Sequence, residues 1–234
     1  MIAVASGSFT IPAGAVAALF ASIIVVVAGF DFFGLLVLFV VGSTLATRYG
    51  FEEKQKAHMS EGSHGERGVP NVLAHIVIPT GLAVGSWLAP SALPVPTAEV
   101  LFTAALAFGA SDTFASELGV LSGHARSILS LRPVPPGTNG GVSPVGEFWA
   151  VVGSLSTGLL SLIFVIAFRG PIPMPGLLVG GASAAGFLGC QVDSVLGETL
   201  ENRGFLTKHG TNFLAMLTSV VLAAVILWLT GNVL

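Results

Sequence analysis

The chain has 234 residues, of which 53% are apolar and 9% are charged, and its formal net charge is −3. Soluble domains carry about a quarter charged residues, so this composition excludes an ordinary soluble protein and predicts an integral membrane protein. The basic residues form no stripe along the chain, which argues against nucleic acid as a partner.

Apolar runs follow one another along the whole chain, and a helix needs roughly 20 residues to cross a bilayer. We interpret seven runs as membrane spans, in chain order 11–30, 32–46, 71–88, 97–114, 145–168, 174–196 and 212–230. The second run is short; it either extends through Thr47 or forms a tilted hairpin with the first run around Asp31. The sequence therefore predicts an all-α polytopic membrane protein with about seven transmembrane helices, built as a single domain over residues 1–234.

The basic residues predict how these spans are oriented. With seven spans, one side of the membrane receives eight of the nine: Arg48, Lys54, Lys56, Arg67, Arg126, Arg132, Arg203 and Lys208. The positive-inside rule makes this side cytoplasmic, which places the N-terminus inside and the C-terminus outside. The outer connections, around Asp31, 89–96 and 169–173, are short and chemically poor. We therefore expect the functional site at the cytoplasmic face.

A polar motif occurs twice in the second half of the chain. Each copy has an Asp followed by a hydroxyl residue, a Glu five residues after the Asp, and a later Gly-Thr-Asn: Asp112, Thr113, Glu117 and 137–139, then Asp193, Ser194, Glu198 and 210–212. Polar residues beside a membrane span are energetically costly, so their repetition indicates a site made of two halves. The fourth and fifth spans share an orientation with the sixth and seventh, which predicts an internal parallel duplication.

The two Asp residues are the strongest candidates for chemistry. Carboxylate oxygens are ligands that Mg²⁺ uses together with substrate phosphates, so Asp112 and Asp193 are predicted metal ligands. The alternative is that each Asp caps a helix or bonds to a polar neighbour. Glu117 and Glu198 lie roughly 140° around a helix from their Asp, which leaves them either supporting the ligands or solvated at the rim.

Phosphate-binding groups are expected in the loops beside the two acids. Residues 132–143 combine prolines and glycines, and backbone N–H groups in such a turn can cradle phosphate oxygens. An ordinary interhelical turn is the alternative, and the loop is not a Walker motif. The predicted phosphate and nucleotide contacts are Arg132, Gly137, Thr138, Asn139, Gly140, Gly141 and Ser143, with Lys54, Lys56 and Arg67 from an earlier loop of mixed charge. Asn71 and Asn212 begin two spans, where helix capping is the competing interpretation.

The segments 111–119, 137–143 and 193–197 resemble the integral membrane family called domain of unknown function ninety-two, which includes a plant phytyl-phosphate kinase. The order and topology match over essentially the whole chain. Two positions differ from the family pattern: Phe114 stands where Trp is common, and Glu198 where a small residue is common.

The resemblance implies a CTP-dependent kinase that converts an isoprenyl (phytyl or geranylgeranyl) monophosphate to the diphosphate with Mg²⁺. In this hypothesis Asp112 and Asp193 hold the metal, Asn139 and Asn212 orient phosphate or nucleotide, and Arg132 with the glycine loop stabilises phosphate charge. A CTP-dependent cytidylyltransferase acting on a lipid phosphate, or an ion-coupled membrane transporter, remains the alternative.

Overall fold

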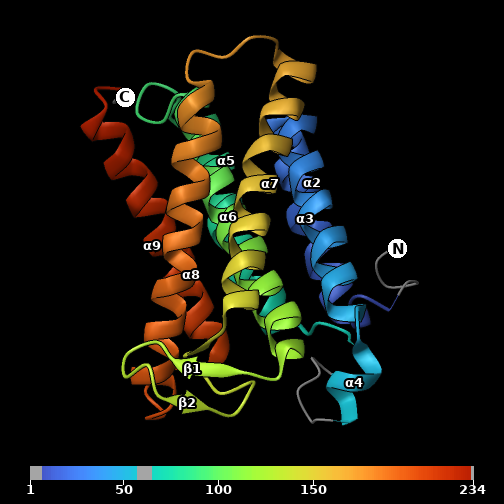
Figure 1. Cartoon of the computed structure of the whole chain (residues 1–234). Coiled ribbons are helices and arrows are strands. Elements are labelled where there is room, and N and C mark those ends of the chain that lie inside the picture. Colours follow the sequence, from blue (N-terminus) through green and yellow to red (C-terminus); the bar gives the residue numbers. More distant parts are fainter. Residues whose placement is uncertain (1–6, 57–64, 233–234) are drawn as a thin grey trace.

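The computed structural model describes residues 7–56 and 65–232, and its long helices run side by side in one bundle (Figure 1). The long helices are α2 (Ile11–Ala28), α3 (Phe30–Arg48), α5 (Val69–Leu88), α6 (Val95–Gly119), α7 (Pro144–Arg169), α8 (Ala182–Leu196) and α9 (Lys208–Leu229). They correspond in order to the seven predicted spans, which confirms the all-α polytopic fold class.

Local sequence sets where several of these helices begin and end. Thr10, Ser143 and Thr207 precede α2, α7 and α9, and each hydroxyl oxygen accepts a hydrogen bond from a backbone N–H of the first turn. Such caps satisfy donors that the helix itself leaves unpaired, a contribution of about 1 kcal/mol each. Gly29 and Gly170 end α2 and α7 with φ angles of 100° and 91°, a backbone conformation that glycine adopts without strain.

Helix α6 is the centre of the bundle, in contact with α3, α5, α7, α8 and α9. Every residue from Thr97 to Ser111 is buried. Neighbouring helices approach it through glycines: a Cβ on Gly186 of α8 would lie 2.6 Å from the Cβ of Ala107, and one on Gly153 of α7 would lie 2.7 Å from the Ala110 carbonyl oxygen. Small residues thus allow the close backbone contact that holds helices together in lipid.

Among the residues that the structure describes, five helices are long and apolar enough to cross a membrane: α2, α3, α5, α7 and α9. Helix α6 is surrounded by protein and needs no lipid-facing surface. Helix α8 is flanked by two segments with wider π-helical turns, η2 (Leu177–Gly181) and η3 (Gly197–Glu201). The membrane character is therefore confirmed, while the count of seven crossings stays a prediction.

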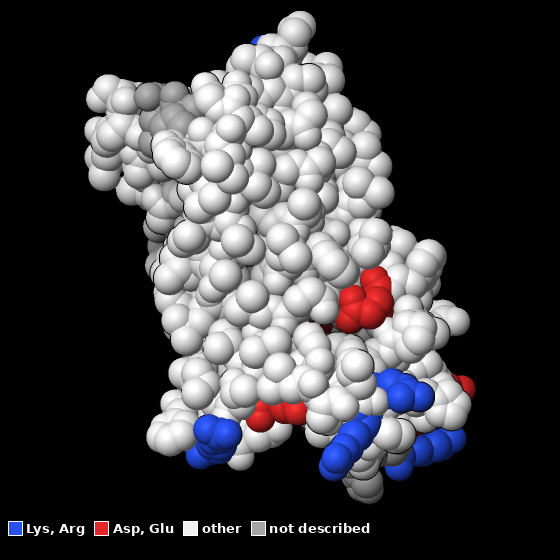
Figure 2. Space-filling view, turned by 60° about the vertical axis from the view of Figure 1, so that its left-hand side comes forward, with Lys and Arg blue, Asp and Glu red and all other residues white. Residues whose placement is uncertain are grey.

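One end of the bundle carries most of the polar structure. The connection between α6 and α7 begins with the short helix η1 (Val120–Ser122) and then folds into strands β1 (Ala125–Ser127), β2 (Pro133–Val134) and β3 (Gly141–Val142). The strands form an antiparallel sheet in the order β2-β1-β3, and the short helix α4 (Phe51–Lys56) lies at the same end (Figure 1). Figure 2 shows Lys, Arg, Asp and Glu side chains gathered near this end of the visible face, below a broad uncharged surface.

The opposite end of the bundle holds charged side chains in contact with one another, although the sequence predicted no functional groups there. Arg169 of α7 places its Nε 2.6 Å from Oδ2 of Asp31 and 3.2 Å from Oε1 of Glu99, which joins α7 to α3 and α6. The Asp31 and Glu99 side chains are almost fully buried. This expectation was wrong because the three residues are far apart in sequence and meet only in the folded bundle.

The proposed duplication is not established by the structure. The α6–α7 connection contains three strands, whereas residues 202–207 between η3 and α9 contain no strand. The two copies of the motif therefore lead into different local structures, and a duplication stays a prediction.

Candidate functional site

A polar cavity of about 290 Å³ opens at the end of the bundle that holds the strands. Helices α5, α6, α8 and α9 and the loop between β2 and β3 line this cavity, which we call the polar cavity. Most residues of the predicted site line it: Asp112, Asp193, Asn139, Asn212, Arg67, Asn71, Gly137, Thr138, Gly140, Gly141, Ser143, Thr113, Glu117 and Ser194. Residues as far apart in the sequence as Arg67 and Asn212 thus line one cavity.

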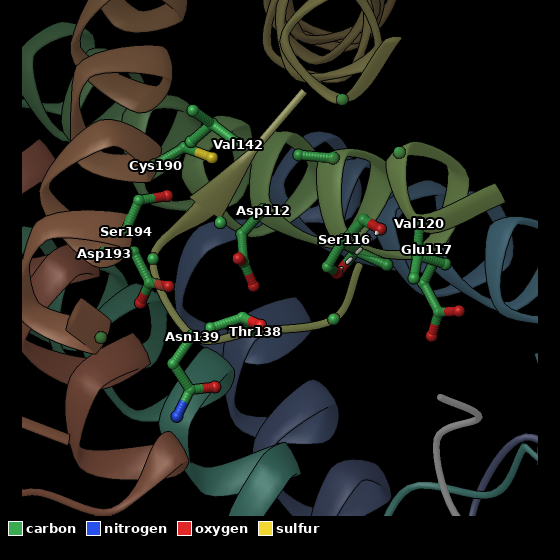
Figure 3. A pocket seen from close by; sticks show the side chains of 18 of the residues that line it. Asp112, Ser116, Glu117, Val120, Thr138, Asn139, Val142, Cys190, Asp193 and Ser194 are labelled. Atoms are coloured by element: carbon green, nitrogen blue, oxygen red, sulfur yellow. Dashed lines mark hydrogen bonds between the residues drawn. The ribbon is translucent and has the colours of Figure 1, made fainter. Parts of the chain in front are cut away.

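The two acids of the repeated motif face the polar cavity from different helices. Figure 3 shows Asp112 on α6 and Asp193 on α8 turned toward the same space. The Oδ1 atom of Asp193 is buried and has no hydrogen-bond partner in the described structure. Asp112, Glu201 and Lys208 are its electrostatic neighbours. Neither Asp caps a helix, because both lie inside helical segments, and so the capping alternative is wrong for these residues.

The Gly-Thr-Asn loop lies across the opening of this cavity, with Thr138 and Asn139 below the two acids in the view of Figure 3. Thr138 donates through its backbone N–H and its hydroxyl to the Pro135 carbonyl oxygen, at 3.2 and 2.7 Å. Gly140 has a φ of 77°, and a Cβ there would lie 2.4 Å from the Cβ of Glu198. Only glycine fits this close approach of the loop to η3.

The Asn of each motif copy contacts the helical segment that carries the other copy. Asn212, from the second copy, donates through Nδ2 to Oδ2 of Asp112, from the first, at 3.5 Å. Asn139, from the first copy, packs against Gly197, one turn beyond Asp193, and its Nδ2 donates to Oε1 of Glu201 at 3.0 Å. Each half of the sequence motif therefore completes the surroundings of the other.

Asn71 and Asn212 are not helix caps. Gly68 and Thr207 occupy the cap positions of α5 and α9, so both Asn side chains lie inside the first turns. Their place on the wall of the polar cavity removes the capping interpretation. Ser143, in contrast, does cap α7: its Oγ accepts from the Gly146 N–H at 3.0 Å.

Two basic residues line the polar cavity, Arg67 and Lys208. Arg67 is 9% exposed, and its guanidinium donates to the Thr47 hydroxyl at 3.3 Å. Lys208 is the first residue of α9. It was not among the predicted site residues, because its charge was used only to predict the orientation of the spans. A signal was present: Lys208 precedes Asn212 by four residues, a spacing that puts both on one helix face.

Three further residues line the polar cavity that were not among the predicted site residues: Glu147, which the sequence left either at the site or at the headgroups, Glu201 and His75. Glu147 of α7 accepts a hydrogen bond from Gln191 Nε2 of α8 at 3.0 Å. His75 is buried and has its Nδ1 2.9 Å from the Asn71 carbonyl oxygen. A carbonyl can only accept, so Nδ1 carries the proton in this contact.

Four predicted site residues lie outside the polar cavity: Lys54, Lys56, Arg132 and Glu198. Lys54 is fully buried and donates to Oε2 of Glu117 at 2.6 Å and to the carbonyl oxygens of Ala46 and Thr47. We therefore assign Lys54 to the packing of α4 and not to a nucleotide. Glu117 lies on the cavity wall, but its carboxylate belongs to this ion pair and is neither a rim charge nor a support for Asp112.

Glu198 fixes residues 125–142, the segment with strands β1, β2 and β3, which we call the strand loop. Its Oε1 accepts from the Ser127 hydroxyl at 2.6 Å and its Oε2 from the Leu129 N–H at 3.3 Å. Arg132 and Lys56 are exposed side chains on the same end of the molecule, so the structure does not bring them to the acids.

The donor set of the polar cavity fits a hard divalent cation that is shared with a substrate. Within the described residues, no group of three or more His, Cys, Asp or Glu side chains could enclose a metal ion. Two carboxylates, one with a buried unpaired oxygen, suit Mg²⁺, which usually keeps open positions for phosphate oxygens and water.

The fold and this cavity define a polytopic helical membrane protein with a polar chamber at one end of its bundle. A family model described as "Integral membrane protein DUF92" matches residues 1–232, and the chain belongs to this family. No solved structure matches the chain.

Relatives of this chain occur in plants, archaea and cyanobacteria. Protein PGR of Arabidopsis thaliana is 32% identical over 196 residues, which cover 76% of this chain and 67% of that protein. An uncharacterized membrane protein of Methanocaldococcus jannaschii is 29% identical over 204 residues, covering 85% of this chain and 77% of the relative. An uncharacterized membrane protein of Synechocystis sp. is 32% identical over 180 residues, covering 76% and 66%.

Proposed function

We propose that this protein is a CTP-dependent kinase that phosphorylates an isoprenyl monophosphate, of the phytyl or geranylgeranyl class, at the cytoplasmic membrane surface. The observation that carries the proposal is the convergence of Asp112 and Asp193 on one cavity with Lys208 and Arg67. The resemblance of segments 111–119 and 137–143 to a family that includes a phytyl-phosphate kinase supports the choice of substrates.

The reaction asks little covalent chemistry of the protein. An oxygen of the acceptor phosphate attacks the γ-phosphorus of CTP, a new P–O bond forms, the bond between the γ-phosphorus and the β–γ bridging oxygen breaks, and CDP leaves. The acceptor oxygen is already anionic and needs no strong general base. Positioning and charge stabilisation then supply most of the catalysis.

The residues of the polar cavity have the chemistry for these tasks. Asp112 and Asp193 would hold Mg²⁺, which would neutralise phosphate charge. Lys208 and Arg67 supply positive charge for the phosphates. Within the turn, the N–H groups of Thr138 and Gly141 donate to the carbonyl oxygens of Pro135 and Thr138. Hydrogen bonds to anionic oxygens would therefore come from the N–H groups of Gly137, Asn139 and Gly140, beside the start of α7. Asn139 and Asn212 would orient the phosphates through their amide groups.

The test uses purified protein in nanodiscs with geranylgeranyl phosphate or phytyl phosphate, Mg²⁺ and radiolabelled CTP. We expect label from the γ-position, but none from the α-position, in a lipid diphosphate product. Transfer of α-label to the lipid would identify a cytidylyltransferase instead. Folded protein that transfers neither label would overturn the kinase proposal, and substrate counterflow into liposomes without nucleotide would favour a transporter.

A further inference from the structure

A second cavity, of about 770 Å³, lies between α2, α3 and α5. Its volume is within the range of roughly 300–1,000 Å³ that small-molecule sites occupy. Nearly all of its wall is apolar, in contrast to the polar cavity. We call it the apolar groove.

The apolar groove exists because one face of α2 carries only small side chains. These residues recur at helical spacing and so lie on one face: Gly14, Ala17, Ala18 and Ala21. Larger apolar side chains of α3, among them Leu36, Val37 and Val40, form the opposite wall. Small residues usually let two helices close on each other, but here they leave a groove along α2.

The apolar groove and the polar cavity meet along one shared wall, made of Arg67, Asn71 and His75. His75 is 7% exposed, and its Nε2 is buried without a hydrogen-bond partner in the described residues. The backbone of Arg67 is fixed to the segment that leads into α2: its N–H donates to the Ser8 carbonyl oxygen at 3.0 Å, and its carbonyl oxygen accepts from the Thr10 N–H at 3.1 Å. A basic side chain and an unsatisfied polar atom therefore stand where apolar walls give way to polar ones.

We propose that the apolar groove holds the single isoprenoid chain of a lipid monophosphate whose headgroup enters the polar cavity past Arg67. This inference rests on the proposed function and names the path by which its lipid substrate is held. Two features favour this occupant: the groove shares the wall of Arg67, Asn71 and His75 with the cavity that contains the acids, and the guanidinium on this wall complements a phosphate monoester. An isoprenoid chain is already removed from water in the bilayer, so its transfer into the groove gains little hydrophobic free energy. The groove therefore distinguishes among lipid chains by their shape.

The first experiment fills the groove and compares a long acceptor with a short one. Ala17→Phe places a large ring against the wall of α3. We expect KM for geranylgeranyl phosphate to rise about tenfold or more, while transfer to dimethylallyl phosphate, whose chain ends near the junction, stays within a factor of two of the original protein. Ala15→Phe is the matched control, because Ala15 is on the same helix, is exposed and does not line the groove. Equal effects of Ala17→Phe on both acceptors, or none on either, would overturn the proposal.

A second experiment does not depend on catalysis or on a variant. The unaltered protein is irradiated with an isoprenyl phosphate that carries a diazirine at the end of its chain. We expect the label in peptides that contain 14–21, 33–45 or 71–76, which line the groove, and labelling confined to the other helices would overturn the proposal. Labelling of the groove without phosphoryl transfer would contradict only the proposed kinase activity. Phosphoryl transfer with labelling elsewhere would contradict only the binding of the isoprenoid chain in the groove. Loss of the label in excess diacyl phosphatidic acid, to the extent seen with unlabelled isoprenyl phosphate, would contradict a single-chain occupant.

Discussion

Asp112 is the residue whose charge can be removed with the least disturbance, because Asn has nearly the same shape and can still bond to Asn212. If Asp112 holds the metal, Asp112→Asn should lower kcat by roughly 100-fold or more, since a neutral amide binds Mg²⁺ more weakly than a carboxylate does. Phosphoryl transfer at saturating CTP and lipid phosphate measures this. Glu52→Gln removes an exposed acid of α4 at the same end of the molecule and should keep full activity. Normal kcat in Asp112→Asn would remove this residue from the metal site.

Substitution of Asp193 should affect thermal stability and catalytic activity in different directions. The Oδ1 atom of Asp193 is buried without a partner in the described structure and the residue shares a cavity with Asp112, so ionising both acids without metal would put two like charges in a poorly solvated space. Asp193→Asn should therefore melt at the same or a higher temperature than the unaltered protein in metal-free detergent, while activity is lost. A ligand present at 100 times its Kd adds about 2.7 kcal/mol of stability. We expect Mg²⁺ with CTP to raise the melting temperature of the original protein and not that of Asp193→Asn; the opposite pattern would exclude Asp193 as a ligand.

Among the structural elements, the strand loop is held to η3 by several contacts, and Glu198 accepts two hydrogen bonds from it. Glu198 accepts from Ser127 and from the Leu129 N–H, and hydrogen bonds to a charged group contribute about 1.5–3 kcal/mol each. Glu198→Ala should release residues 125–142, raise KM for CTP about tenfold and expose the loop to limited proteolysis. Glu198→Gln keeps the shape and one acceptor, so its effect should be smaller. A loop that resists the protease equally in all three proteins would contradict this role.

The sequence predicted elements well where their physics is local. Apolar runs and hydroxyl caps such as Ser143 determine helices within a few residues, and the paired motifs led to Asp112 and Asp193. Contacts between distant segments were not predictable: Lys54 lies 63 residues from Glu117, and their pairing depends on how α4 folds back onto α6. The strands were not predicted either, because a strand of two or three residues is too short to show the alternation of polar and apolar residues that indicates a strand.

At the scale of the whole molecule, the bundle separates two environments around α6. One end holds the polar cavity, the strand loop and α4, whereas the other end holds the Arg169 cluster and short connections. The apolar groove runs along the flank between α2 and α3 and shares Arg67, Asn71 and His75 with the wall of the polar cavity. In the proposed function, the apolar chain of a lipid phosphate would occupy the apolar groove and its phosphate the polar cavity.

The orientation of this division in the membrane is the remaining prediction. Eight of nine Lys and Arg residues belong to the connections that face the polar cavity end, so the positive-inside rule places that end in the cytoplasm. In a Cys190→Ala background, Ser91→Cys reports the connection between α5 and α6, and Arg203→Cys reports the cavity end; both positions are exposed. A membrane-impermeant maleimide added to intact cells should label Ser91→Cys at once and Arg203→Cys only after the cells are opened. The reverse pattern would place the polar cavity outside, where CTP is scarce, and would contradict both the orientation and a cytosolic nucleotide as phosphate donor.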